Sequence, residues 1–161
     1  MSLKEFKIGL VELYQGEVIG EVLFYRMLER FSSADQLYKL GTLLQLETET
    51  KARLRPAVMQ LGLDLVELDE SRDKGNEFYR TFEGMDWEAA MAHLATVVKP
   101  FVKRYRQIAE VAPPEYKQLA NSMVVHEQSI QDAAELEAAG DGDRSMDDVI
   151  RQLVFPLPKQ V

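Results

Sequence analysis

The sequence predicts an all-α protein: a bundle of four long helices with one long crossover between the second and third, plus a short C-terminal helix and an extended tail. Three observations lead to this fold class. Apolar residues recur at steps of three and four in four long segments, which is the period of one helix face. Turn-forming residues separate these segments. The connections between them are short, long and short, and a long second connection can run the length of a bundle.

The length and composition predict one domain. The 161 residues, 46% of them hydrophobic, are enough for one substantial core. We expect residues 1–140 to form the helical bundle. Residues 141–161 should form a short helix and a tail that packs on the bundle or on a partner subunit.

Charge and composition narrow the classes of partner and ligand. The formal net charge of −8 argues against nucleic acids and anionic membranes, because both attract a basic surface. The sequence contains neither a long apolar run nor the residue order of a signal peptide, so we expect a cytoplasmic protein. It also contains no cysteine, so a metal ion would need oxygen and imidazole ligands.

The first predicted helix carries carboxylates on its apolar face. This face consists of Phe6, Leu10, Leu13, Glu17, Glu21, Phe24 and Leu28. Gly16 and Gly20 form a second row, four residues apart. Glycine destabilises helices, so the row indicates either close approach by a neighbouring backbone or simple tolerance of glycine.

The second predicted helix begins with Ser33 and Gln36, which have capping-box spacing, and ends near Gly62. Its apolar face consists of Leu37, Leu40, Leu44, Glu47, Lys51, Leu54, Val58 and Leu61. The charged segment from Leu63 to Met85 has weak periodicity. We expect it to be a long surface connection with room for a short helix in its middle.

The third and fourth predicted helices are separated by Pro113 and Pro114. Asp86 can cap the third, whose apolar face consists of Trp87, Met91, Leu94, Val98, Phe101, Tyr105 and Ile108. The fourth has Tyr116, Leu119, Met123, His126 with Glu127, Ile130, Ala134 and Glu137, and stops at Gly140. Ser145 and Asp148 have the spacing to cap a last short helix.

Polar residues interrupt three of these apolar faces near their midpoints, and they are the candidate metal ligands. They are Glu17, Glu21, Glu47, His126 and Glu127. Buried charge is costly unless it is paired, hydrogen-bonded or bound to metal. Counted from the first turn, Glu17 and Glu47 lie at nearly the same height in an antiparallel pair. The sequence therefore predicts a polar centre halfway along the bundle.

With this topology and these ligand types, residues Leu3 to Gly140 resemble the ferritin-like superfamily, in particular rubrerythrin-like and di-iron carboxylate proteins. Those proteins carry one Glu on each of two helices and Glu-x-x-His on the other two. Here Thr50 stands where a His should follow Glu47, and Met123 stands where a Glu should precede His126. The third helix carries no acidic residue on its core face. The resemblance therefore implies an incomplete ligand set.

Two functions follow from this polar centre. In the first, Glu17, Glu47 and His126 bind one non-haem iron or manganese ion, Glu21 or Glu127 assists, and the protein is an oxidoreductase. In the second, no metal cofactor binds. Lys51 pairs with Glu47 or Glu17, and His126 bonds the remaining carboxylate. The bundle then acts as a small-ligand-binding or dimerisation module.

Pro100 interrupts the third predicted helix and tends to kink it, because proline removes a backbone donor. A kink at this height could open an apolar pocket for a small molecule. Its predicted residues are Thr50, Lys51, Pro100, Phe101, Tyr105 and Met123. The alternative is a bend that only improves packing. We also expect a homodimer, the commonest oligomer, formed through one apolar helix face.

Overall fold

The computed structural model describes residues 3–159, and all regular elements in this range are helical. This confirms the predicted all-α class. The α-helices are α1 (Leu3–Met27), α2 (Ala34–Gln60), α3 (Asp69–Arg80), α4 (Trp87–Val111), α5 (Lys117–Ala138) and α6 (Asp147–Ile150). Short 3-10 turns span Pro114–Tyr116 and Gly142–Arg144.

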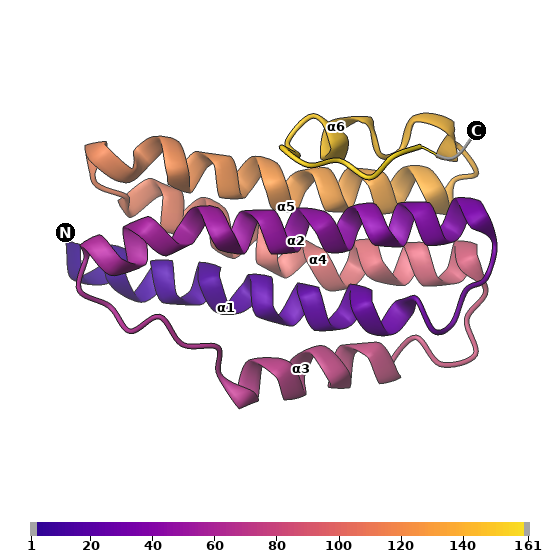
Figure 1. Cartoon of the computed structure of the whole chain (residues 1–161), viewed down its shortest axis with the longest axis horizontal. Helices are drawn as coiled ribbons and strands as arrows, with labels where there is room; N and C mark the ends of the chain where they lie inside the picture. The colour runs from indigo at the N-terminus through magenta and orange to yellow at the C-terminus, as the bar shows by residue number, and fades with distance from the viewer. Residues whose placement is uncertain (1–2, 160–161) are drawn as a thin grey trace.

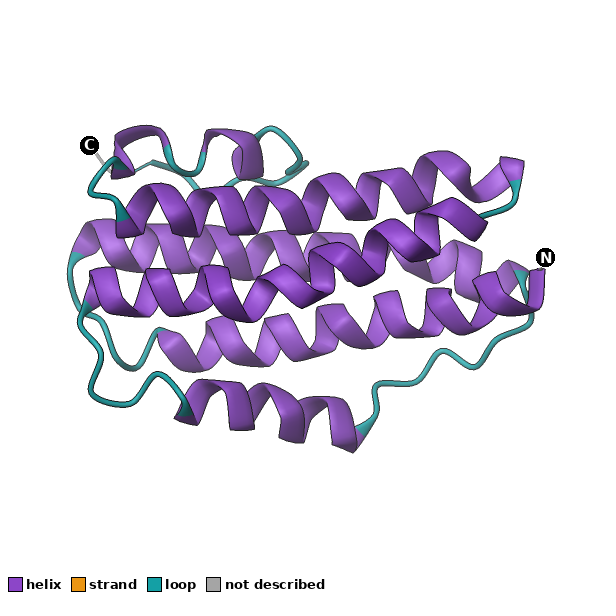
Figure 2. Ribbon diagram, turned by 180° about the vertical axis from the view of Figure 1, so that it is seen from behind, coloured by secondary structure: helices purple, strands orange, loops and turns teal. Residues whose placement is uncertain are grey.

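Four long helices, α1, α2, α4 and α5, lie alongside one another (Figures 1 and 2). Helices α1 and α2 form an antiparallel pair. The chain then returns past α1 through α3, so that α4 runs in the same direction as α2 and α5 runs back against it (Figure 1). The long connection that contains α3 therefore separates the α1–α2 pair from the α4–α5 pair (Figure 1).

The core consists of two apolar clusters, and each draws residues from all four long helices. One cluster includes Leu23 of α1, Leu46 of α2 and Ile130 of α5. The other includes Leu13 of α1 and Met123 of α5. Along the helices, the polar side chains of the candidate site lie where one cluster gives way to the other.

Side-chain caps and glycines fix the helix ends. Ser33 Oγ accepts a hydrogen bond of 3.1 Å from the Gln36 amide, and Asp86 caps α4 by accepting one of 2.9 Å from the Ala89 amide. Gly62 and Gly140 adopt φ values of 67° and 81°, the left-handed conformation that closes helices. The caps predicted at Ser33 and Asp86 and both predicted stops are present. The cap predicted at Ser145 is absent, because α6 follows Met146 and the Ser145 hydroxyl donates to Glu137 instead.

Helix α3 packs against α1 along a narrow stripe (Figure 1). A Cβ on Gly75 would lie 2.9 Å from the Ile19 carbonyl oxygen, so the two backbones approach closely there. The Arg26 and Arg30 guanidinium groups of the α1 segment lie 4.5 and 4.1 Å from the Tyr79 ring centroid. The crossover therefore contains a helix that packs on the outer side of α1.

The C-terminal segment lies against the bundle. Glu49 of α2 accepts hydrogen bonds from the Val154 and Phe155 amides at 2.6 and 3.1 Å. Near α6, the buried carboxylate of Glu137 pairs with Lys39 and accepts a 2.7 Å bond from the Trp87 indole. The backbone at Val154 and Phe155 is therefore tied to α2, although both side chains are exposed. Residues 160 and 161 lie outside the described range.

Within residues 3–159, no helix combines the length and apolar character needed to cross a bilayer.

Candidate metal centre

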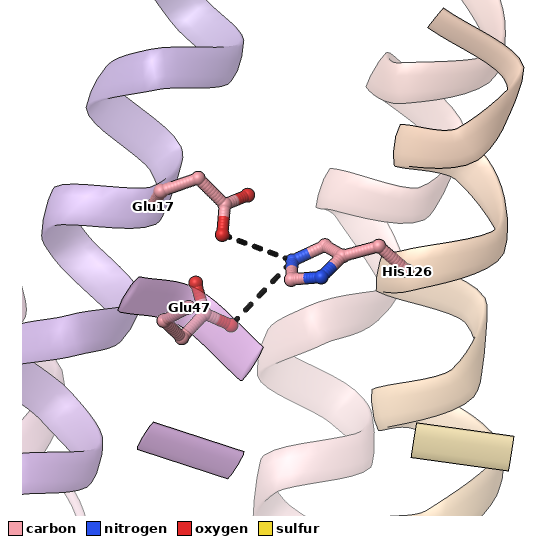
Figure 3. A group of neighbouring side chains, drawn as sticks. All are labelled: Glu17, Glu47 and His126. Carbon is pink, nitrogen blue, oxygen red and sulfur yellow. Dashed lines mark ion pairs between the residues drawn. The ribbon is translucent and has the colours of Figure 1, made fainter. Parts of the chain in front are cut away.

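Three helices bring Glu17, Glu47 and His126 together in the middle of the molecule (Figure 3). His126 Nε2 lies 3.1 Å from Glu17 Oε2 and 3.6 Å from Glu47 Oε1. One potential ligand atom from each residue lies within 4.8 Å of the other two. All three side chains are buried, with exposed fractions of 0%, 3% and 0% for the residues. The sequence-predicted polar centre is present at these three positions.

Glu127 adds a third carboxyl group to this cluster. Its Oε2 atom lies 3.5 Å from His126 Nε2, and the residue is buried. Neighbouring residues on a helix point about 100° apart, so they cannot both project straight inward. The flexible glutamate side chain nevertheless brings its carboxyl group to the imidazole from the edge of the helix interface.

With every carboxyl group ionised, several polar atoms at this centre lack hydrogen-bond partners. They are both carboxyl oxygens of Glu17 and Nε2 of His126, and all three are buried. An unpartnered buried polar atom costs about 1–3 kcal/mol, and a charged one costs more. Because Nε2 and Glu17 Oε2 lie 3.1 Å apart, either a proton shared between them or an ion bound beside both would satisfy the two atoms.

Thr50 holds the opposite nitrogen of His126. Its Oγ1 atom lies 3.2 Å from His126 Nδ1 and accepts a 3.2 Å hydrogen bond from Arg53 Nη2. In the tautomer that carries its proton on Nδ1, the imidazole donates to Thr50, and its Nε2 lone pair points toward the carboxyl groups. In that tautomer, the residue that stands where the family has histidine would fix the orientation of the His126 ring.

Burial dominates the electrostatics of the cluster. It raises the pKa of Glu17 and Glu47 well above the ordinary range, and the Glu17 charge raises the pKa of Glu47 further. Burial raises the pKa of Glu127 to about 8. It also raises the pKa of Tyr105, to which the charge of Glu127 adds. Without a cation, these carboxyl groups therefore tend to hold protons near neutral pH.

The two glycines of α1 make room for side chains of neighbouring helices. A Cβ on Gly20 would lie 2.5 Å from Glu47 Oε2, and one on Gly16 would overlap the Tyr105 hydroxyl. The sequence suggested close approach by a backbone. The structure corrects this interpretation, because a carboxylate and a phenol occupy the space.

Glu21 and Lys51 lie beside the cluster rather than in it. Glu21 accepts hydrogen bonds from Lys51 Nζ at 2.7 Å and from Thr48 Oγ1 at 2.6 Å. Lys51 also pairs with Glu67 of the crossover. The expected pairing of Lys51 with Glu47 or Glu17 is therefore replaced by a network that ties α1, α2 and the crossover together.

The six residues predicted to line one pocket do not border a single space. Pro100, Phe101 and Tyr105 line an open groove of about 530 Å³ between α1, α3 and α4. Met123 is fully buried in a core cluster, and neither Thr50 nor Lys51 borders the groove. Pro100 itself is exposed and faces outward, so the opening lies on the surface of α4 rather than within the bundle.

The spacing of the cluster fits one metal ion. Ligand atoms about 2.1 Å from an ion lie roughly 3.0–3.5 Å apart at adjacent positions of an octahedron or tetrahedron. The distances from His126 Nε2 to the three carboxyl groups are 3.1, 3.5 and 3.6 Å. Glu17, Glu47 and His126 could therefore hold the ion with Glu127 beside them.

Comparisons with protein-family models, curated proteins and solved structures found no match for this chain.

Proposed function

We propose that the protein binds one non-haem iron or manganese ion through Glu17, Glu47 and His126, with Glu127 assisting, and that it is an oxidoreductase with a ferritin-like bundle. One observation carries the proposal. Glu17 Oε2 and His126 Nε2 face each other at 3.1 Å (Figure 3). Both atoms are buried, and neither has a hydrogen-bond partner while Glu17 is ionised.

The charge balance supports a cation. Three carboxyl groups surround one imidazole, and no lysine or arginine in residues 3–159 forms an ion pair with Glu17, Glu47 or Glu127. Buried carboxylates require compensation. A divalent ion would neutralise two negative charges and give the unpartnered atoms a ligand role.

The donor set supports iron or manganese. Carboxylates suit hard ions, imidazole suits several transition metals, and the combination of one histidine with carboxylates is typical of non-haem iron sites with open positions. Such an ion would supply redox chemistry with oxygen. Thr50 would orient His126, and the surrounding core would exclude bulk water.

The course of the helices supports the ferritin-like part of the proposal. Two antiparallel pairs, α1 with α2 and α4 with α5, are joined by a crossover that runs the length of the molecule (Figure 1). This is the connection that ferritin-like bundles use. The acidic positions lost from α4 and α5 favour one ion over two.

Replacement of Glu47 tests the ligand assignment. Glu47→Ala should abolish metal binding, because it removes a buried oxygen ligand. Glu21→Ala is the matched control, since Glu21 lies nearby on α1 but bonds Lys51 and Thr48 instead. Metal per chain should be measured by elemental analysis after anaerobic loading with Fe(II) or Mn(II). Equal metal contents in wild type and Glu47→Ala would contradict the assignment.

The alternative is a metal-free ligand-binding protein. The raised pKa values of Glu17, Glu47 and Glu127 favour it, because protonated carboxyl groups can stay buried without a cation. In this case chelators should leave the melting temperature unchanged. A metal that binds only the folded chain should instead raise it by mass action.

A further inference from the structure

An apolar groove runs over the face formed by α1, α3 and α4. Its volume is about 530 Å³, within the range of roughly 300–1,000 Å³ typical of small-molecule sites. Ile19, Val97 and Phe101 supply much of its apolar lining, and Phe78 of α3 supplies another wall. The crossover helix therefore builds one side of the groove.

A smaller cavity lies behind this groove and touches the candidate metal centre. It measures about 30 Å³ and is bordered by Glu47 and Glu127. Five residues border both spaces: Gly16, Ile19, Phe78, Val97 and Phe101. The two spaces are therefore adjacent, and the smaller one, which Glu47 and Glu127 border, is large enough for a water molecule.

Aromatic rings form the wall between these spaces. The rings of Phe78 and Phe101 meet edge to face at 6.1 Å, and those of Phe101 and Tyr105 at 6.4 Å. Aromatic pairs prefer such offset or edge-to-face geometry, and a bound aromatic ring could extend the series. An aromatic or other flat apolar group therefore suits this surface.

The rim of the groove carries one uncompensated positive charge. Arg104 binds both oxygens of Glu12 at 2.7 and 2.8 Å, which neutralises that pair. Lys74 is exposed, and its ammonium lies 5.9 Å from the Phe78 ring centroid. Among the described residues, Lys74 forms no ion pair. An anionic group at the end of an apolar ligand would meet it here.

We propose that the groove binds a small anionic amphiphile as the substrate of the metal centre. The apolar, preferably aromatic, body lies against Phe78 and Phe101, and the anionic group lies at Lys74. The opposite end of the ligand then faces the cavity that Glu127 and Glu47 border. Only the assignment of this ligand as the substrate rests on the proposed metal function.

Two fluorescent probes test the groove on metal-free protein. 1-Anilinonaphthalene-8-sulfonate carries a sulfonate, and N-phenyl-1-naphthylamine has nearly the same body without the charge. Filling the groove from two different helices, with Ile19→Trp or Val97→Trp, should weaken both probes at least tenfold. Circular dichroism identifies any variant that loses helix. Unchanged binding of both probes by a folded filled variant would overturn the proposal.

Charge reversal at the rim tests the anionic part. Lys74→Glu should weaken the sulfonate probe several-fold, because exposed charge contacts contribute up to about 1 kcal/mol. It should change binding of the neutral probe less than twofold. Lys103→Glu is the matched control: Lys103 is an exposed lysine of α4 that does not border the groove. Equal losses in both charge variants would contradict a specific role for Lys74.

Glu17→Gln separates this inference from the metal assignment. Glu17 borders neither the groove nor the small cavity. The variant should therefore lose metal and keep probe binding. If the wild type binds metal but the filled variants bind the probes unchanged, the ligand site in the groove is rejected and the metal centre is retained. If the filled variants lose probe binding but the wild type fails to bind any metal, the proposed metal function is rejected and the ligand site is retained.

Discussion

The hydroxyl of Thr50 should control the metal affinity of His126. It lies 3.2 Å from Nδ1 and fixes the ring nitrogen that does not face the carboxyl groups. Loss of such an outer partner typically lowers metal affinity about 10–100-fold. We expect this loss in Thr50→Val, which keeps the side-chain shape, and not in Thr50→Ser. Competition with a chelator of known affinity measures it, and equal affinities in the three proteins would rule out the positioning role.

The buried carboxyl groups predict a pH dependence of stability in the metal-free protein. The pKa of Glu127 is raised to about 8, whereas an unfolded glutamate titrates near the ordinary value of about 4.3. Between these values the folded state retains a proton that the unfolded state has released. The free energy of unfolding should therefore fall as pH rises, by up to about 1.4 kcal/mol per pH unit for this group.

Urea unfolding at several pH values between 5 and 8 checks this pH dependence, because that interval lies between the two pKa values. Glu127→Gln cannot ionise and should show a weaker fall in stability over the same range. Metal affinity should change in the opposite direction to stability and increase with pH, because a metal ion must displace protons from its ligands. A stability that increases with pH in the metal-free wild type would contradict the buried-carboxyl account.

At the scale of the helix, the absence of a side chain at Gly20 leaves room between α1 and α2 for the Glu47 carboxylate. Gly20→Ala should favour the helix by up to about 1 kcal/mol through propensity alone. Its methyl group, however, would lie 2.5 Å from Glu47 Oε2 and force that carboxylate to move. We therefore expect weaker metal binding in a chain that remains helical. Isothermal titration calorimetry measures this, and wild-type affinity in the variant would show that the close contact does not position Glu47.

Helix ends and the heights of the ligands could be predicted because local chemistry determines them. Ser33 and Asp86 cap their helices through their own side chains. Glu17 and Glu47 were predicted at one height by counting from the turn between them. Side-chain direction required the structure: Glu21, one turn away on the same face, points to Lys51 and Thr48.

The crossover shows that a mostly polar segment can form a packed helix. Only Ser71 and Gly75 of α3 are buried, so the segment lacks a broad apolar stripe. Its attachment depends on the Tyr79 ring, Gly75 and polar contacts to α1. Consequently the groove wall at Phe78 could not be predicted from the sequence, and the pocket expected at Pro100 inside the bundle is replaced by a groove on its surface.

At the scale of the whole molecule, the fold places a polar layer between two apolar clusters. These clusters hold the four long helices in register, and this register brings Glu17, Glu47 and His126 together. The layer itself contributes little to stability without a compensating ion, because burial raises the pKa of its carboxyl groups. The molecule is thus built so that metal binding and folding should be coupled. The expected homodimer stays a prediction, which sedimentation of the purified chain tests.

The stoichiometry of metal binding tests the central claim most directly. Chain purified without a metal-chelating column should be titrated anaerobically with Fe(II) and Mn(II), and bound metal should be counted per chain by elemental analysis. The single-ion centre predicts one equivalent, with a higher melting temperature in the loaded protein. Absence of bound metal after both additions would contradict the metal centre, and two equivalents would contradict the single-ion site.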